Sequence, residues 1–392
     1  MIRLFLNGLA ASAGGGVTYL RNVIPRLAQS ADVEATVVVP SSLRREFGEA
    51  TKIVFVEAPD CRGTLRRIVW EQTQLRELIE DSDANVLLSA GNFALWNSPV
   101  PQILLSRNSL YTSADFRRDL RVRGEYSLCA DTWIKGWLAR QSIMRADVTI
   151  APSDAFAQEL ARWTGRNITV IPHGFDREAF AGDPSPLPES MQKQIDRAED
   201  SLRLLFVSHY NYYRNFETLI RALPLLRDRL PGTEVRLFLT CSLKSRENPG
   251  AYRAESAAAL VTELKVGEQV VELGMVPYRS LHHLYRACHI YVSPAYTETF
   301  AHPLVEAMST GLPLVVSDLP VHREICGDAA LYFPRFSPEG LADSVLRIRQ
   351  SPQEATVLSR NGLARAQDFS WKKHVERLLA VAKELVSKNL AQ

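Results

Sequence analysis

Short apolar runs alternate with longer amphipathic stretches along most of the chain. The short runs are rich in leucine and β-branched residues and are bounded by turn-forming residues, which is typical of β-strands. The longer stretches repeat apolar residues every three or four positions, which is typical of helices. This alternation predicts βαβ units around a parallel sheet, and the nearly continuous apolar runs indicate a sheet that is buried on both faces.

The predicted elements form two successive groups. The first has strands at residues 2–6, 36–39, 53–56, 86–89, 103–105, 148–151 and 169–171, and helices at 17–29, 64–80 and 155–164. The second has strands at 202–207, 235–239, 270–273, 290–293 and 314–316, and helices near 216–229 and 252–264. Between the groups, a proline-rich segment without a strand pattern indicates a linker.

The pattern therefore predicts an α/β protein with two doubly wound, Rossmann-like domains. Residues 1–181 form the first domain, 182–201 the linker and 202–369 the second domain. Residues 370–392 form a final helix with one apolar face. Two such domains facing a central cleft would bind a ligand beyond the carboxyl ends of their strands.

Composition narrows the class of protein without identifying its function. The 392 residues are 46% hydrophobic, which excludes a disordered chain, and a net charge of +2 gives no reason to expect nucleic acid binding. The five cysteines contain no C-x-x-C pair, which argues against a disulfide framework and a zinc site. No apolar run approaches the ~18 residues needed to span a membrane. We therefore expect a cytoplasmic protein.

Three glycines at residues 14–16 follow the first predicted strand and open the helix at 17–29. They let the backbone approach a ligand closely, and a helix start favours anions. The segment completes neither a dinucleotide fingerprint nor a P-loop. A flexible strand-to-helix turn explains these glycines equally well.

The segment 293–311 holds two carboxylates around a predicted helix start. Glu298 follows the strand at 290–293, and Glu306 lies about one turn inside a helix that begins near His302 and Pro303. Ionised carboxylates only accept hydrogen bonds, and a helix start attracts phosphate. The pair therefore suits a polyhydroxylated ligand that also carries a diphosphate.

This segment resembles the E-x7-E motif of retaining glycosyltransferases of family 4, the group 1 glycosyl transferases, which have the GT-B fold. Further segments resemble other motifs of the family in the order that it requires: Ile171-Pro172-His173-Gly174-Phe175-Asp176, Phe206-Val207-Ser208-His209 with Arg214-Asn215, Gly274 with Val276-Pro277, and Phe369-Ser370-Trp371. The resemblance covers most of the chain and is closer in the second half. It implies that the final helix at 370–392 packs back on the first domain.

The resemblance implies a retaining glycosyltransferase. It would move a sugar from a nucleotide-diphospho-sugar to a hydroxyl of a glycan or lipid-linked acceptor, in surface polysaccharide or lipopolysaccharide assembly, without a metal or other cofactor. Glu298 would accept hydrogen bonds from the transferred sugar and Glu306 from the ribose, while His209 and Arg214 would neutralise the departing diphosphate. Further donor contacts would come from Gly15, Gly16, Val276, Phe300, Ala301 and His302.

Several residues depart from the family pattern. His209 replaces an arginine and is charged only part of the time near neutral pH, Arg214 replaces a lysine, and Ala301 replaces a glycine beside the donor sugar. On the acceptor side, Arg107 and Asn108 stand where the family often has His or Asp, so no catalytic base is assigned. This suits the same-face mechanism that the resemblance implies, in which a phosphate oxygen of the leaving group takes the acceptor proton and the protein stabilises the developing charge.

The stretch 115–145 combines basic residues with aromatic ones, including Trp133 and Trp137. Three interpretations stay open: peripheral contact with a membrane, such as the inner face of the plasma membrane; an acceptor groove; or a solvated basic face with inward-packed tryptophans.

Other functions also stay open. A GT-B nucleotide-sugar epimerase would need further acid–base groups, which we cannot place, and a phosphorylase would need a longer chain. A bilobal binding protein would favour export, and a catalytically degenerate partner subunit would fit the weakened clamp at His209. The donor, the acceptor and the oligomeric state are not determined by the sequence.

Overall fold

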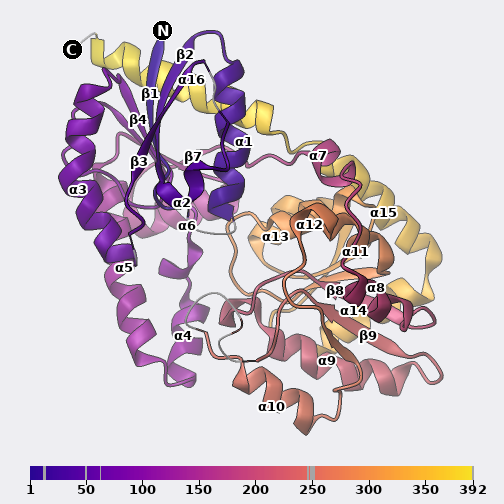
Figure 1. Ribbon diagram of the computed structural model, residues 1–392. Helices are drawn as coiled ribbons and strands as arrows, with labels where there is room; N and C mark the ends of the chain where they lie inside the picture. Colours follow the sequence, from indigo (N-terminus) through magenta and orange to yellow (C-terminus); the bar gives the residue numbers. More distant parts are fainter. Residues whose placement is uncertain (12–14, 49–50, 62, 245–246, 248–251, 391–392) are drawn as a thin grey trace. The chain divides into compact units, whose positions relative to one another are not determined.

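The computed structural model describes residues 1–11, 15–48, 51–61, 63–244, 247 and 252–390. The chain divides into two compact units (Figure 1). The first unit comprises Met1–Ser113, Gly124–Gly174 and Ser370–Gln392, and the second comprises Ala114–Arg123 and Phe175–Phe369.

The first unit is built on a seven-stranded parallel sheet with the order β3-β2-β1-β4-β5-β6-β7. Its strands are β1 (Ile2–Asn7), β2 (Val33–Pro40), β3 (Ile53–Ala58), β4 (Val86–Ser89), β5 (Gln102–Leu105), β6 (Val148–Ala151) and β7 (Thr169–Val170). Its helices are α1 (Gly15–Gln29), α2 (Ser41–Arg44), α3 (Thr64–Asp81), the 3-10 turn η1 (Ser109–Tyr111), α5 (Tyr126–Arg145), α6 (Asp154–Thr164) and α16 (Trp371–Leu390).

The second unit is built on a six-stranded parallel sheet with the order β10-β9-β8-β11-β12-β13. Its strands are β8 (Leu202–Phe206), β9 (Val235–Leu239), β10 (Val270–Glu272), β11 (Ile290–Ser293), β12 (Leu314–Ser317) and β13 (Ala330–Phe333). Its helices are α4 (Ala114–Val122), α7 (Arg177–Ala181), α8 (Glu189–Asp196), η2 (Tyr212–Arg214), α9 (Phe216–Arg229), α10 (Glu255–Glu263), η3 (Tyr278–Ser280), α11 (Leu281–Ala287), α12 (His302–Ser309), α13 (Pro320–Cys326), η4 (Gly327–Ala329), α14 (Pro338–Gln350) and α15 (Pro352–Ala366).

The two sheets confirm the predicted fold class. In both, the strand order reverses beside the first strand of the unit, so β1 lies between β2 and β4, and β8 lies between β9 and β11. All residues of β4, β5, β11 and β12 are buried, which explains why their sequences lack polar alternation. Ligands of such sheets bind at the carboxyl edge where the order reverses.

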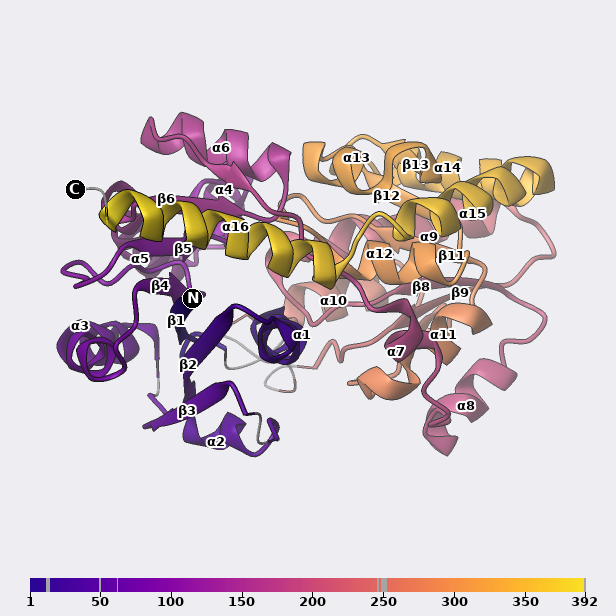
Figure 2. The same cartoon turned by 90° about the horizontal axis from the view of Figure 1, so that it is seen from above.

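The final helix α16 belongs to the first unit and contacts α1, β1 and β4 (Figure 2). Trp371, Val375, Leu378 and Ala382 are buried in the core of this unit. Burial of this apolar stripe fixes the helix on the sheet.

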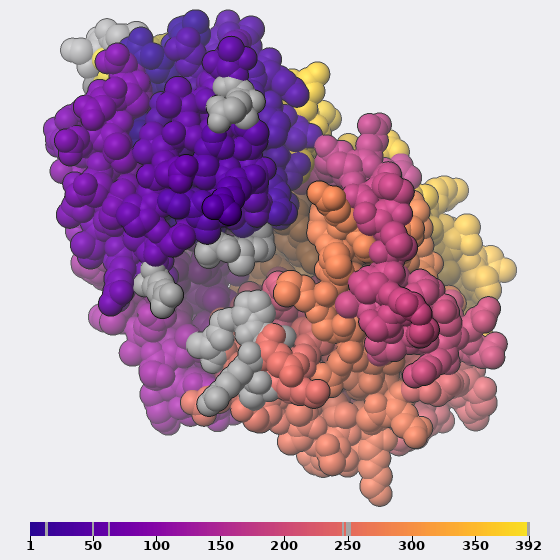
Figure 3. Space-filling view, viewed as in Figure 1, coloured from indigo at the N-terminus to yellow at the C-terminus, as the bar shows by residue number. Residues whose placement is uncertain are grey.

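The structure differs from the sequence prediction at the boundaries between the units. The first unit ends at Gly174 and resumes at Ser370. The backbones of Gly174 and Trp371 approach closely there, since a Cβ built at Gly174 would lie only 2.0 Å from Trp371 N. The predicted linker 182–201 contains α8, and α7 and α8 lie on the surface of the second unit (Figure 3). Strand β13 was not predicted.

The stretch 115–145 is not one surface, because its two helices belong to different units. Helix α4 is part of the second unit, whereas α5 is part of the first. The interpretations of this stretch therefore apply to each helix separately.

Candidate active site

Glu298 and Arg214 form an ion pair at the carboxyl edge of the second sheet. Arg214 follows β8 and Glu298 follows β11, and these strands are neighbours at the point where the strand order reverses. Both side chains are largely buried, with 19% and 10% of their surface exposed. The structure thus brings together two of the three residues to which the resemblance gave catalytic roles, at the position where ligands of this fold bind.

Asn215 fixes the geometry of this pair. It has a left-handed backbone conformation (φ +56), which asparagine tolerates better than most residues, and it ends η2 and begins α9. Its side-chain amide donates to the carbonyl of Pro294 (3.0 Å), and Tyr296 N donates to the carbonyl of Tyr213 (3.0 Å). These bonds join the loop that carries Arg214 to the loop that carries Glu298.

The start of α12 lies next in the chain after Glu298. Ala301 caps this helix in a left-handed conformation (φ +63), which costs an alanine energy and a glycine nothing. Backbone conformation therefore supplies a physical reason for the glycine that the family usually has here. Phe300 is buried, its ring lies against His302 (centroids 4.9 Å apart), and the first turn of the helix favours an anion through its partial positive charge.

Glu306 lies within α12 and is buried. Burial raises the pKa of its carboxyl from the usual 4.5 to about 7, although a hydrogen bond from the Tyr285 hydroxyl (2.8 Å) acts in the opposite direction. A carboxylate with this pKa changes its charge in the physiological range. Tyr285 was missed in the sequence, where nothing distinguishes it from the other apolar positions of α11.

His209 follows β8, at the same edge of the sheet as Arg214. Its partial burial, and then the positive charge of Arg214, lower the pKa of its imidazole below the usual 6.5. His209 is therefore mainly uncharged at neutral pH, and Arg214 is the permanent cation of the predicted pair. Val276 lies between β10 and η3 and is half-buried.

In the first unit, Gly15 and Gly16 open α1, and Gly14 lies outside the described residues. Arg107 Nη1 donates to the carbonyl of Gly15 (3.1 Å), and a Cβ at Gly16 would lie 2.9 Å from Arg107 Nη2 and 3.0 Å from Ala11 Cα. Gly16 is thus required for this close approach. Burial lowers the pKa of Arg107 to about 10, so that it stays charged at neutral pH.

Asn108 has a local structural role in the same loop. Its side chain accepts a hydrogen bond from Leu110 N (3.0 Å) and caps η1. The predicted acceptor residues Arg107 and Asn108 therefore lie together after β5, at the carboxyl edge of the first sheet. The structure describes two groups of predicted site residues, one in each unit.

Potential metal ligands do not cluster in the part of the chain that the structure describes. There, no three His, Cys, Asp or Glu side chains lie together in a way that could hold a metal ion. The five cysteines are all free thiols. None of the described helices is both long enough and apolar enough to cross a membrane.

Two Rossmann-like units, each built on a doubly wound parallel sheet, are the architecture of the GT-B fold. The chain belongs to the glycosyl transferases of group 1: the model of this family matches residues 189–365, and the model of glycosyltransferase family 4 matches residues 13–179. The resemblance seen in the sequence is thereby confirmed.

Individual relatives agree with this family. The chain is 28% identical over 246 residues to a D-inositol 3-phosphate glycosyltransferase of Actinosynnema mirum, which covers 61% of this chain and 58% of the relative. It is 35% identical over 99 residues to O-antigen chain mannosyltransferase B of Escherichia coli, which covers 25% of this chain and 26% of the relative. The match thus spans little more than half the length of the first relative.

Solved structures share the fold over nearly the whole chain. Sucrose-phosphate synthase of Thermosynechococcus elongatus has a TM-score of 0.77 at 18% identity and covers 99% of this chain and 100% of its own. HepE of Anabaena, solved in complex with UDP-glucose, has a TM-score of 0.72 at 16% identity and covers 98% of this chain and 100% of its own.

Proposed function

We propose that this protein is a retaining glycosyltransferase that moves a sugar from a nucleotide-diphospho-sugar to a hydroxyl of a glycan or lipid-linked acceptor. The observation that carries the proposal is the Arg214–Glu298 pair at the switch point, immediately before the start of α12. Arg214 and the helix start would stabilise the diphosphate, and Glu298 would accept hydrogen bonds from the sugar. Glu306 would accept hydrogen bonds from the ribose.

In the proposed reaction the bond between the sugar and the diphosphate breaks, and a bond to the acceptor oxygen forms on the same face of the sugar. A phosphate oxygen of the leaving group takes the acceptor proton. The protein contributes a fixed cation, Arg214, and fixed dipoles where negative charge develops. We propose that this requires no metal ion or other cofactor.

The relatives suggest the class of donor and acceptor. HepE was solved with UDP-glucose, and the Escherichia coli relative is named as an O-antigen chain mannosyltransferase. We therefore propose a role in surface polysaccharide or lipopolysaccharide assembly. A catalytically inactive partner subunit is the second candidate, because His209 is mainly uncharged at neutral pH.

Thermal unfolding with a panel of nucleotides tests the donor site. UDP, GDP, ADP, TDP and their common sugar conjugates are added to the protein in EDTA, and a ligand at a hundred times its Kd adds about 2.7 kcal/mol to the free energy of unfolding. We expect a higher melting temperature with one base, unchanged by EDTA. A lack of any shift would contradict the proposed donor site, and a shift that EDTA abolishes would contradict metal independence.

The protein is expected to bind the stabilising nucleoside diphosphate more weakly as the pH is lowered. Because the pKa of Glu306 is about 7, only about a tenth of its carboxyl is ionised one pH unit lower, which weakens binding by roughly tenfold if the carboxylate is the required form. Calorimetric Kd values between pH 6 and pH 8 measure this change. The Glu306→Gln variant should lack this part of the dependence, whereas protonation of the nucleotide and of His209 affects both proteins alike.

The Glu306→Gln substitution should also change the pH dependence of folding stability. This effect is independent of ligand binding, and its pH dependence has the opposite direction. The folded protein holds the Glu306 proton more tightly than the unfolded chain between pH 4.5 and about 7, so the wild-type protein loses stability as the pH rises through this range. The free energy of unfolding of Glu306→Gln minus that of wild type, measured with urea, should therefore be more positive at pH 8 than at pH 5. Equal differences at both pH values would contradict the raised pKa.

We also propose peripheral contact with a membrane through α5. This helix buries small or short residues, including Gly136 and Ala139, and exposes Tyr126, Trp133 and Trp137 with 72%, 71% and 50% of their surface accessible. Folding stability alone would favour burial of the aromatic side chains and exposure of the small ones. A row of exposed aromatic side chains is typical of an interaction surface. Arg140 and Arg145 are also exposed on this helix and would attract anionic lipid.

Vesicle sedimentation tests the α5 surface. The double variant Trp133→Ser, Trp137→Ser should bind vesicles of phosphatidylglycerol and phosphatidylcholine about tenfold or more weakly than wild type, because each tryptophan contributes apolar area to the interface. The control is Leu65→Ser, Val69→Ser, which removes two exposed apolar side chains from α3 of the same unit. Equal binding by wild type and the tryptophan variant would contradict the proposal.

A further inference from the structure

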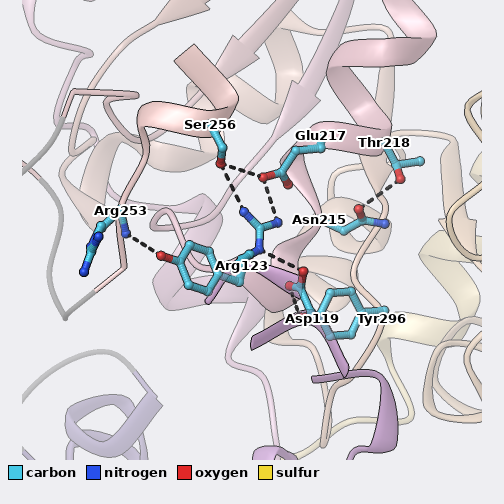
Figure 4. A network of polar contacts seen from close by, with 9 residues as sticks. Asp119, Arg123, Asn215, Glu217, Thr218, Arg253, Ser256 and Tyr296 are labelled. Carbon is cyan, nitrogen blue, oxygen red and sulfur yellow. Dashed lines mark hydrogen bonds and ion pairs between the residues drawn. The ribbon is translucent and has the colours of Figure 1, made fainter. Parts of the chain in front are cut away.

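Helix α4 lies in the chain between β5 and β6 of the first sheet, yet it is part of the second unit. Phe116 and Leu120 are its buried apolar residues, and Asp119 and Arg123, on the same side of the helix, make a set of polar contacts (Figure 4). The centre of this set is Arg123, the residue after the helix.

Arg123 uses its guanidinium group on several partners at once (Figure 4). Its Nε donates to Asp119 Oδ1 (2.8 Å), its Nη2 lies 2.8 Å from Glu217 Oε1, and its Nη1 donates to Ser256 Oγ (3.0 Å). Only 18% of the Arg123 side chain is exposed. A rigid planar fork that contacts two carboxylates fixes both of them relative to one another.

The two carboxylates connect Arg123 to the two loops that carry Arg214 and Glu298. Glu217 lies in the first turn of α9, three residues after Arg214. Asp119 Oδ2 accepts a hydrogen bond from the Tyr296 hydroxyl (2.7 Å), and Tyr296 lies two residues before Glu298. Arg123 and Asp119 therefore connect the loop of Arg214 with the loop of Glu298, on top of the direct contacts made by Asn215 and Tyr213.

This network is poorly explained by stability alone. Desolvation of partly buried charges offsets most of the attraction between them, so such pairs add little net free energy of unfolding. They do define one geometry, and a displacement of about 1 Å at a reacting centre can cost a hundredfold in rate. Because the network lies next to the loops of Arg214 and Glu298, it can fix the positions of these two side chains.

We propose that Arg123 and Asp119 are positioning residues of the donor site. Neither touches the sugar or the diphosphate. They hold the Arg214 loop and the Glu298 loop at the separation that the transition state requires, so that a helix from the first half of the sequence completes the site in the second unit. This inference rests on the proposed transfer from a nucleotide-diphospho-sugar.

The first test is kinetic and uses the Arg123→Ala variant. With UDP-glucose, or the donor selected by the thermal panel, we expect kcat for donor turnover to fall about a hundredfold. The Kd of the matching nucleoside diphosphate should change less than about threefold, because Glu306, the helix start and the positive charge of Arg214 are all retained. Arg123→Lys keeps one charged contact and should recover part of the activity.

A second test does not depend on activity. Hydrogen–deuterium exchange should become faster in peptides that cover residues 207–216 and 294–301 in Arg123→Ala. The matched control is Arg347→Ala, which removes another paired arginine from the same unit, on α14, where it contacts Glu354. This control should change neither exchange in these peptides nor kcat.

Coupling between the two loops gives a third readout. Tyr296→Phe removes the hydroxyl that donates to Asp119. If Arg123 and Tyr296 act through one network, the double variant should lose no more activity than Arg123→Ala alone. Fully additive losses would contradict the network.

The outcomes separate the two proposals. A wild-type protein that turns over no nucleotide-sugar would overturn the proposed function, while the exchange experiment would still report on the two loops. If the wild type is active, an unchanged kcat in Arg123→Ala would overturn the positioning role. A lower melting temperature of this variant with unchanged exchange in both loops would overturn it as well.

Discussion

The variant Glu298→Gln is expected to lose at least about a hundredfold in the rate of sugar transfer while it keeps its affinity for the nucleoside diphosphate. Glutamine has nearly the same shape as glutamate, so the loop after β11 should keep its conformation. The change removes the negative charge that pairs with Arg214 and one acceptor for the sugar hydroxyls. Since the nucleotide is held by other groups, its Kd should stay within about threefold of wild type.

Rates of transfer and calorimetric Kd values measure the two effects separately. The matched control is Glu354→Gln, which breaks the ion pair with Arg347 in the same unit outside the candidate site. This control should leave the transfer rate unchanged. Full transfer activity in Glu298→Gln, or an equal loss in both variants, would mean that Glu298 does not contact the transferred sugar.

Replacement of Arg214 by alanine should damage both binding and transfer. The Arg214 guanidinium is the permanent cation of the His209–Arg214 pair, because burial and Arg214 itself keep His209 mainly uncharged at neutral pH. Loss of one preorganised charged contact costs about 3 kcal/mol of transition-state stabilisation, or roughly a hundredfold in rate. It should also raise the Kd of the nucleoside diphosphate by about tenfold or more, since charge-assisted hydrogen bonds contribute about 1.5–3 kcal/mol.

Arg214→Lys distinguishes charge from geometry. It keeps the positive charge and loses the planar fork, so we expect transfer within about tenfold of wild type. Arg347→Ala is the control for loss of an arginine from the same unit. An Arg214→Ala variant with normal transfer would show that another group stabilises the diphosphate, and His209→Ala would then be the next variant to measure.

Much of the fold could be predicted from the sequence. The strands at Val86–Ser89, Val148–Ala151, Val235–Leu239 and Ile290–Ser293 have the predicted bounds, because strands of a parallel sheet are buried on both faces and stay apolar from end to end. Strand β13 was missed because its four residues lie at the edge of the sheet and two of them are only half-buried.

Helix α5 shows where periodicity has no predictive value. Its buried face contains small and polar residues, such as Thr132 and Ser142, while Trp133 and Trp137 are exposed. Apolar residues thus occur around the whole helix, and the sequence could not show which tryptophans face outward. Only the packing of neighbouring elements decides that.

The candidate site, like the fold, could be predicted only in part. The motif around Glu298 and Glu306 could be recognised in the sequence, because a helix start and a fixed spacing are local features. Its partners could not: Tyr285 contacts Glu306, and Asp119 and Arg123 contact residues near Arg214 and Glu298, across as many as 177 residues of sequence. Short-range patterns carry no information about such pairs.

The sequence by itself determined the fold class, most of the strands, the family and the segments that carry the donor site, since each depends on local patterns of burial, turn formation and spacing. The tertiary structure alone decided which charges meet. It pairs Arg214 with Glu298, raises the pKa of Glu306 by burial, and places α4 in the second unit. These features depend on distance and desolvation, which exist only once the chain has folded.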